Sequence, residues 1–284
     1  MHDTSEHELA LGPAFLPLTL TPGPDCIAAV AAAVGESGRG FACFSHRGAL
    51  LVALDDRARL HTFLRRRAEP FTETVARESQ HCPIIINGNY YGLARRHKWR
   101  AWLLDRPLLG ARTLPEGQVR NNARALGGRA APLMFYFGQG PAGFECGQGA
   151  LPAHLTAGLE GLGPLILDGL VYASANEYRG ESLWRRGNNT YKSLQEHPPA
   201  TGKTLLAHHR RAHLLLLWVQ PDGRAEHTLD DIRDWLVAGE FDDAVFLDGS
   251  DSALLSVDGA LMVPPGSEKN RANTIGLGFV PYCD

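Results

Sequence analysis

A short apolar run that ends at Asn-Gly or Asp-Gly recurs along this 284-residue chain, and it constrains the fold more than any other feature. The runs are "IIING" at 84–88, "LILDG" at 165–169, "VFLDG" at 245–249 and "LSVDG" at 255–259. Runs of this kind predict buried strands, and Asn-Gly and Asp-Gly favour tight hairpin turns. An apolar hairpin pattern around His46-Arg47-Gly48 and the run "LLLLWV" at 214–219 add further strands. We therefore expect an α+β fold with a mostly antiparallel sheet flanked by a few helices.

Helical spacing of apolar residues is confined to a few segments. It is found in the Ala-rich stretch 26–36, in "RLHTFLRRR" (59–67) and "TETVARES" (72–79), and in the segment after Thr228. Thr228 followed by Asp231 is an acidic variant of the capping box, which fixes where the last of these helices begins. We expect short helices at these places.

The composition is that of an ordinary globular protein. Hydrophobic residues make up 44% and charged residues 21% of the chain, and the net charge is −3 at pH 7. A general nucleic-acid binder carries a basic excess, so the charge argues against a nucleic-acid partner. The five cysteines show no C-x-x-C spacing, so we predict no metal ligands, and the sequence leaves any cofactor unknown. We expect an irregular lead-in over residues 1–25 and a single domain over 26–284.

The N-terminus, "MHDTSEHELALGPAFLPL", does not have the pattern of an export signal. Acidic residues stand where a signal peptide has basic ones, and prolines interrupt the apolar run. The apolar run at 214–219 is far shorter than the roughly 20 residues that a membrane-spanning helix needs. We expect a soluble, cytoplasmic protein without a membrane span.

Polar residues are concentrated in the stretch "FLDGSDSALLSVDG" at 246–259. An EF-hand loop that began at Asp248 would need Gly at its sixth position and Glu at its twelfth, where this chain has Ala253 and Gly259. That excludes an EF-hand, and it leaves a plain turn, another metal site using Asp248 and Asp251, or an acid–base site. A carboxylate at the end of a buried strand is partly desolvated, which raises its pKa toward the range useful in acid–base catalysis. Asp248 is therefore the candidate acid–base residue.

Two other segments also place polar residues next to a buried strand. "IIINGNYYG" delivers Asn87 and Asn89 beside aromatic residues, and "TGKTLLAHH" places Lys203 and Thr204 beside an apolar run. The order of these elements resembles the phosphodiester glycosidase family, which has an "NGGFF"-like elbow, a "PRTAIG"-like segment, and "LDGGGSSTL" followed by a hairpin and an arginine in the last strand. The likeness covers about 82–91 and 164–281 of this chain.

This resemblance implies a phosphodiester-glycosidase-like fold and a site built from matching positions. Asp248 matches the aspartate of the last motif, and Asp251 offers a second carboxylate, so both are candidate catalytic residues. The remaining candidates are expected to bind substrate, and they are Asn87, Gly88, Tyr90, Lys203, Thr204, Gly249, Ser252 and Arg271. In this interpretation Lys203 and Arg271 hold the phosphate and Tyr90 stacks on the sugar ring. The other polar side chains hydrogen-bond to the sugar, and the set lines one cleft.

The chain differs from the family pattern at several positions. Asn89 replaces a glycine of the elbow, Lys203 stands where the family has arginine, and Ser250 and Asp251 replace two glycines. The main hypothesis is a hydrolase that cleaves a sugar-1-phosphodiester or a related glycosidic bond, acting on a small molecule or glycan that carries phosphate. The alternatives are a catalytically inactive module that binds a glycan or nucleotide-sugar, and an enzyme acting on an intracellular nucleotide or phosphorylated sugar.

Overall fold

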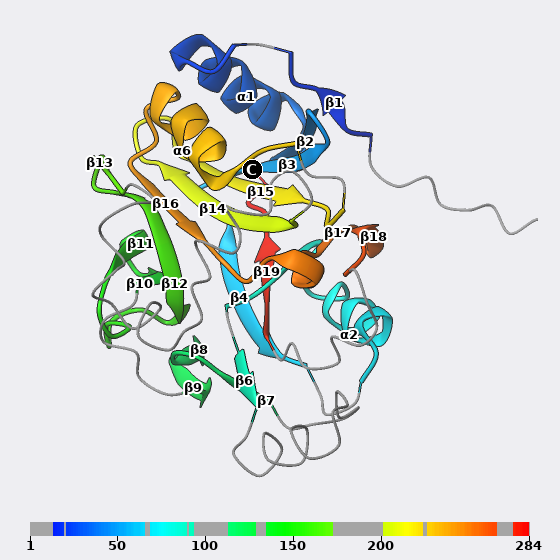
Figure 1. Ribbon diagram of the computed structural model, residues 1–284, viewed down its shortest axis with the longest axis vertical. Coiled ribbons are helices and arrows are strands. Elements are labelled where there is room, and N and C mark those ends of the chain that lie inside the picture. The colour runs from blue at the N-terminus through cyan, green and yellow to red at the C-terminus, as the bar shows by residue number, and fades with distance from the viewer. Residues whose placement is uncertain are drawn as a thin grey trace, which may run out of the picture.

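A computed structural model describes residues 14–19, 21–65, 69–89, 91–93, 113–128, 135–172, 201–223, 226–265 and 275–283. Within these residues two β-sheets face each other, and helices cover their outer sides (Figure 1). Most neighbouring strands are antiparallel, and the short pair β1–β2 is parallel. The expected α+β class with mostly antiparallel strands is confirmed.

The larger sheet has twelve strands. Its main path, in spatial order, is β1 (Leu16–Pro17), β2 (Phe41–His46), β3 (Ala49–Asp55), β15 (Leu214–Gln220), β14 (Lys203–His209), β16 (Asp243–Phe246), β12 (Ala157–Leu167), β10 (Phe135–Gly140) and β11 (Gly143–Gln148). Three short strands extend it from β12, namely β13 (Leu170–Val171), β8 (Val119–Asn121) and β9 (Arg124–Gly127). Strand β14 thus lies in the middle of the sheet, between β15 and β16.

The smaller sheet has five strands. Their spatial order is β18 (Ala260–Val263), β17 (Leu255–Val257), β5 (Ile84–Asn87), β19 (Ile275–Val280) and β4 (Arg59–Leu64). A separate two-stranded ribbon joins β6 (Tyr91–Leu93) to β7 (Thr113–Pro115). The Asn-Gly and Asp-Gly signals at 87–88 and 258–259 fall at the ends of β5 and β17, as the sequence predicts.

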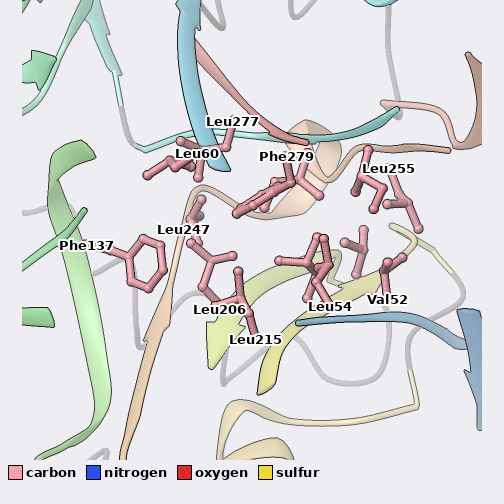
Figure 2. Packing of buried hydrophobic residues seen from close by; sticks show 14 of the residues in the cluster. Val52, Leu54, Leu60, Phe137, Leu206, Leu215, Leu247, Leu255, Leu277 and Phe279 are labelled. Atoms are coloured by element: carbon pink, nitrogen blue, oxygen red, sulfur yellow. The ribbon is translucent and has the colours of Figure 1, made fainter. Parts of the chain in front are cut away.

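The space between the two sheets is the main hydrophobic core (Figure 2). Leu206 and Leu215 of the larger sheet pack there with Leu255, Leu277 and Phe279 of the smaller one, and all five are fully buried. Since successive side chains of a strand point to opposite faces, the residues beside them on β14 and β15 face the other way. Burial of this apolar surface fixes the register of both sheets and hence the positions where their strands end.

Helices cover the outer faces of the sheets. Helices α1 (Pro24–Glu36) and α6 (Leu229–Ala238) lie on the outer face of the larger sheet, where they pack in one cluster with Leu205 and Trp218 (Figure 1). Helix α2 (Phe71–Glu78) contributes Val75 to a cluster on the outer face of the smaller sheet. The structure confirms the capping box, because Thr228 Oγ1 accepts a hydrogen bond from Asp231 N at 3.0 Å and Asp231 Oδ2 accepts one from Thr228 N at 2.8 Å.

Two expectations differ from the structure. The segment that begins "RLHTFL", expected to be helical, forms strand β4, because all six residues from Arg59 to Leu64 pair with β19. Its Leu60 packs in the core between the sheets, and its Phe63 packs in the cluster with α2. Apolar residues three positions apart also fit one face of a helix, so the spacing along the chain did not distinguish the two structures. In addition, β1 and the first residues of α1 fall within 1–25, which was expected to be irregular.

Candidate active site

Asn87 joins three segments that are far apart in the sequence. Its side chain is 2% exposed and lies at the end of β5. Its Oδ1 accepts hydrogen bonds from Thr204 Oγ1 at 2.7 Å and from Leu254 N at 3.0 Å, and its Nδ2 donates to the carbonyl oxygen of Asp248 at 2.7 Å. These bonds use the polar atoms of Asn87 and Thr204 within the protein, so the pair positions the segment 248–254, which we call the Asp248 elbow.

Backbone contacts fix the same elbow from two sides. Asp248 N donates to Gly88 O at 3.1 Å, and Ser250 N donates to Gly202 O at 2.8 Å. A Cβ atom at Gly202 would come within 2.4 Å of Ser250 O, so glycine is needed there for the close approach. The elbow is therefore held where the end of β5, the start of β14 and the end of β16 meet.

Asp248 is a half-buried residue, and its carboxyl group has a strongly perturbed pKa. The pKa of Asp248 is raised to about 7, chiefly by burial and also by the negative charges of Asp251 and Glu116, against hydrogen bonds from the Ser252 hydroxyl and from Gly249 N. The bond from Gly249 N to Oδ1 measures 3.1 Å. At neutral pH this group therefore exists in both protonated and ionised forms, as a proton donor or acceptor requires.

Ser250 has the backbone conformation of a glycine. Its φ is 57°, in the left-handed region that residues other than glycine adopt only at a cost. It opens a short 3₁₀ turn, Ser250–Ser252, that carries Asp251 and Ser252. The elbow thus keeps a glycine-type backbone at this position although serine replaces the glycine of the resembling motif.

Glu116 acts electrostatically on Asp248 and was not a candidate from the sequence. The fully buried Asn89 donates from Nδ2 to Glu116 O at 3.1 Å. This bond links the turn after β5 to the segment that carries Glu116. Glu160 is also fully buried, and its carboxylate accepts hydrogen bonds from Gln118 N and from Leu151 N. Glu116 follows a Gly- and Arg-rich stretch without periodicity, so no sequence signal linked it to Asp248.

Lys203 lies outside this cluster. Leu205 and Ala207 of β14 pack with α1 and α6 while Leu206 faces the smaller sheet, so Lys203 shares the helix-covered face. Its Nζ is buried and donates to Thr201 O at 2.9 Å. Burial lowers the pKa of Lys203 to about 8, against the charges of Asp222 and Asp231, which favour its ionised form. The structure therefore brings Asn87, Gly88, Thr204, Asp248, Gly249, Asp251 and Ser252 together and places Lys203 on the other face of the strand.

Tyr90 and Arg271, expected to bind the sugar ring and the phosphate, lie outside the described residues. Within the described part of the chain, no group of three or more His, Cys, Asp or Glu side chains is arranged to hold a metal ion. A search of that same part finds no helix with the length and apolar character needed to cross a membrane.

The fold is similar to that of a solved glycosidase domain. The catalytic domain of zebrafish N-acetylglucosamine-1-phosphodiester alpha-N-acetylglucosaminidase, auto-inhibited by its pro-peptide, aligns with a TM-score of 0.57 and 16% identity over 85% of this chain and 82% of that chain. A hypothetical protein from Synechocystis aligns with a TM-score of 0.46 and 13% identity over 84% of this chain and 61% of that chain. No protein-family model and no curated protein matches the sequence. At this identity the first alignment shows a related fold.

Proposed function

We propose that this protein is a hydrolase that cleaves a sugar-1-phosphodiester or a related glycosidic bond, with Asp248 as its acid–base residue. The observation that carries the proposal is the carboxyl group of Asp248, a half-buried residue just after β16, whose pKa is raised to about 7. Two further carboxylates, Asp251 and Glu116, act on it electrostatically. The similarity of the scaffold to a glycosidase catalytic domain supports the reaction class.

In the proposed reaction the protonated Asp248 gives its proton to the leaving oxygen as the bond from that oxygen to the anomeric carbon breaks. A water molecule adds to the anomeric carbon, and its proton passes to an ionised carboxylate, Asp251 or Glu116. Glycoside hydrolysis uses two carboxyl groups in this way, one protonated and one ionised. In this division of roles Asp248, whose pKa is raised, is the protonated carboxyl group.

The neighbouring residues then have two kinds of role. Asn87 and Thr204 hold the elbow in place, because their polar atoms already bond to each other and to the backbone. Gly88 and Gly249 bring the backbone close to the substrate, and Ser252 hydrogen-bonds to the carboxyl group that transfers the proton. Tyr90 and Arg271 keep the sugar-stacking and phosphate-binding roles that the resemblance implies.

A second candidate function is a binding module that retains a glycan or nucleotide-sugar site without the chemistry. One observation favours it: Ser250 and Asp251 add side chains and a charge where the resembling motif has glycines. A carboxylate at this point repels a phosphate group, so the family substrate loses affinity unless the phosphate lies elsewhere.

Turnover separates the two functions. The purified chain is incubated with a panel of sugar-1-phosphodiesters, aryl glycosides and nucleotide-sugars, with and without EDTA, and release of free sugar is followed. The proposal expects release by the wild type, loss of release in Asp248→Asn, and unchanged release in the control Asp258→Asn. Asp258 is a matched carboxylate because it also comes directly after a strand, β17, but it pairs with Arg39 at the surface. Thermal stabilisation by a ligand of the panel without any release of sugar would instead support the binding module.

A further inference from the structure

Two consecutive residues after β5 bond to the two segments that carry Asp248 and Glu116. Gly88 O accepts a hydrogen bond from Asp248 N at 3.1 Å. The next residue, Asn89, donates from Nδ2 to Glu116 O at 3.1 Å. Asn89 is fully buried, and a hydrogen bond in surroundings of low dielectric constant is electrostatically stronger than one in water. The turn after β5 therefore sets the distance between the two segments.

Strand pairing supports the same placement. Asn89 lies two residues before Tyr91, the first residue of β6, and Glu116 directly follows Pro115, the last residue of β7. Tyr91 and Pro115 stand opposite each other in the antiparallel ribbon of β6 and β7. The bond from Asn89 to Glu116 O therefore closes this ribbon at its base, where the chain enters and leaves it.

Strand β12 holds the segment that carries Glu116 from a second direction. Glu160 of this strand is fully buried, and its carboxylate accepts hydrogen bonds from Gln118 N at 3.0 Å and from Leu151 N at 2.6 Å. Glu160 N donates to Gln118 O at 2.9 Å, and Glu160 O accepts from Asn89 Nδ2. Asn89 thus bonds both to Glu116 and to the strand on which the following residues are held.

Two glycines let these backbones approach closely. The φ of Gly117 is 117° and that of Gly161 is 83°, both in the left-handed region. A Cβ atom at Gly117 would come within 2.5 Å of the Glu160 carbonyl carbon, and one at Gly161 within 1.7 Å of Glu116 O. A side chain at either position would move the segment away from β12. This close packing leaves the backbone of Glu116 little freedom to move.

Glu116 and Asp251 are the two candidates for the ionised partner of Asp248. In glycoside hydrolysis the two carboxyl groups flank the scissile bond and lie about 5–10 Å apart. Asp251 belongs to the 3₁₀ turn Ser250–Ser252, which begins two residues after Asp248 in the same elbow. Glu116 acts electrostatically on Asp248 from a separate segment, and both segments are bonded to one turn. Glu116 therefore meets the requirement of an opposing group better than Asp251 does.

We propose that Glu116 is the ionised carboxylate of the reaction and that Asn89 is a positioning residue, which holds Glu116 at its distance from Asp248. This inference rests on the proposed function, in which the role is open between Glu116 and Asp251. As water adds to the anomeric carbon, its proton passes to Glu116 while Asp248 gives its own proton to the leaving oxygen, so the total charge of the pair is unchanged. Asn89 stands where the resembling motif has a glycine, and a glycine has no side chain to make this bond.

A titration of the Asp248 carboxyl group tests the positioning role without any substrate. The side-chain carboxyl carbons of aspartate are labelled with ¹³C, and the midpoint of Asp248 is compared in the wild type, Glu116→Gln, Asn89→Ala and the double variant. Glu116→Gln is expected to lower the midpoint, because the charge of Glu116 raises it. Asn89→Ala is expected to lower the midpoint in the wild type, where it releases Glu116, and to leave the midpoint of Glu116→Gln unchanged.

Asn121→Ala is the matched control. Asn121 lies on β8, just after the segment that carries Glu116, and its Oδ1 accepts from Thr62 N at 3.4 Å, so the variant is expected to leave the midpoint unchanged. The positioning role is overturned if Asn89→Ala leaves the wild-type midpoint unchanged or lowers it equally in Glu116→Gln. It is also overturned if Asn121→Ala lowers the midpoint as much. Circular dichroism checks folding, and Asn89→Gly, the residue of the motif, replaces Asn89→Ala if that variant does not fold.

Turnover tests the catalytic role of Glu116. On any substrate that the wild type hydrolyses, Glu116→Gln is expected to lower kcat by at least about 100-fold and Asp251→Asn by less than about tenfold. Asn89→Ala is expected to lower kcat about 10- to 100-fold and to change KM by less than about twofold, because it misplaces a group that acts in the transition state. A larger loss in Asp251→Asn than in Glu116→Gln overturns the assignment. If the wild type hydrolyses no substrate, the proposed function fails and the catalytic role of Glu116 fails with it, while the titration still decides whether Asn89 positions Glu116.

Discussion

The Asp248 elbow and the ring cluster formed by His46, Trp218, His227 and Trp235 lie on different sides of the larger sheet and differ in how their polar atoms are paired. In the elbow, Asn87 and Thr204 satisfy each other and the backbone. In the ring cluster, Trp218 Nε1, His227 Nε2 and Trp235 Nε1 have no partner among the described residues. Adjacent residues of β14, Lys203 and Thr204, divide between the two sides of the sheet. Hydrogen bonds therefore position the reactive carboxyl group in the elbow, whereas packed rings hold the cluster.

The largest expected effect is a loss of turnover when the proton donor of the elbow is removed. Asp248→Asn removes the proton donor but keeps an oxygen that accepts from Gly249 N and Ser252, so the backbone stays in place. General acid–base groups contribute about 10²–10⁴-fold, and we expect kcat to fall by at least about 100-fold on any substrate that the wild type hydrolyses. Circular dichroism checks that the variant is folded, and a loss of less than about tenfold would contradict the acid–base assignment.

The second effect breaks the closed network. Asn87→Ala leaves Leu254 N, Thr204 Oγ1 and the carbonyl of Asp248 without their partner. We expect the free energy of unfolding, measured in urea, to fall by about 3 kcal/mol. Thr204→Val removes only the hydroxyl and serves as the graded control, with a loss of about 1 kcal/mol. Similar losses in the two variants would mean that Asn87 is not the centre of the network.

The third effect is a pH dependence of stability. The folded pKa of Asp248, about 7, is higher than the ordinary value of 3.8, so the folded state binds this proton more tightly than the unfolded state does. The stabilising contribution is complete below about pH 4 and is lost as the pH rises to about 7. Asp248→Asn lacks this loss, so the variant should gain on the wild type by about 4 kcal/mol across that window. A constant difference between the two unfolding free energies from pH 4 to 8 would show that the pKa is not raised.

The smallest effect concerns Lys203 and tests whether this residue lies on the side of β14 that faces away from the catalytic site. Because the folded pKa of Lys203, about 8, is lower than the ordinary 10.5, the folded state disfavours its charge at pH 7. Lys203→Met fills a similar volume, and it should raise the free energy of unfolding at pH 7 by about 1 kcal/mol. This gain should shrink as the pH rises from 8 to 10.5. Turnover should stay within about twofold of the wild type, whereas a loss of tenfold or more would return Lys203 to the catalytic site.

The sequence predicted most of the elements and part of the site. Runs that end at Asn-Gly or Asp-Gly, and Thr228 with Asp231 as a capping box, are local signals, and the structure confirms the strands and the capping box. The expected hairpins form at 168–169 and 258–259, whereas the strands that end at Asn87 and before Asp248 pair with more distant strands. The segment 59–64 was misassigned because its strand state comes from pairing with β19, more than 200 residues away.

Contacts between distant segments also decide the rest of the site. Successive side chains of β14 alternate between the two sides of the sheet, and a motif alignment does not show on which side Lys203 lies. Glu116 raises the pKa of Asp248 from a segment without periodicity, and the ring cluster around Trp235 combines His46 with residues more than 150 positions away. Neither arrangement leaves a pattern along the chain.

The most direct test of the account is a measurement of the pKa of Asp248 itself. The side-chain carboxyl carbons of aspartate are labelled with ¹³C, the chemical shifts are followed by NMR from pH 3 to 9, and Asp248→Asn identifies the resonance. We predict a midpoint of about 7, as expected for a carboxyl group that burial and two neighbouring carboxylates keep protonated. A midpoint at or below the ordinary 3.8 would contradict the account, because Asp248 would then be ionised at neutral pH and could not donate the proton.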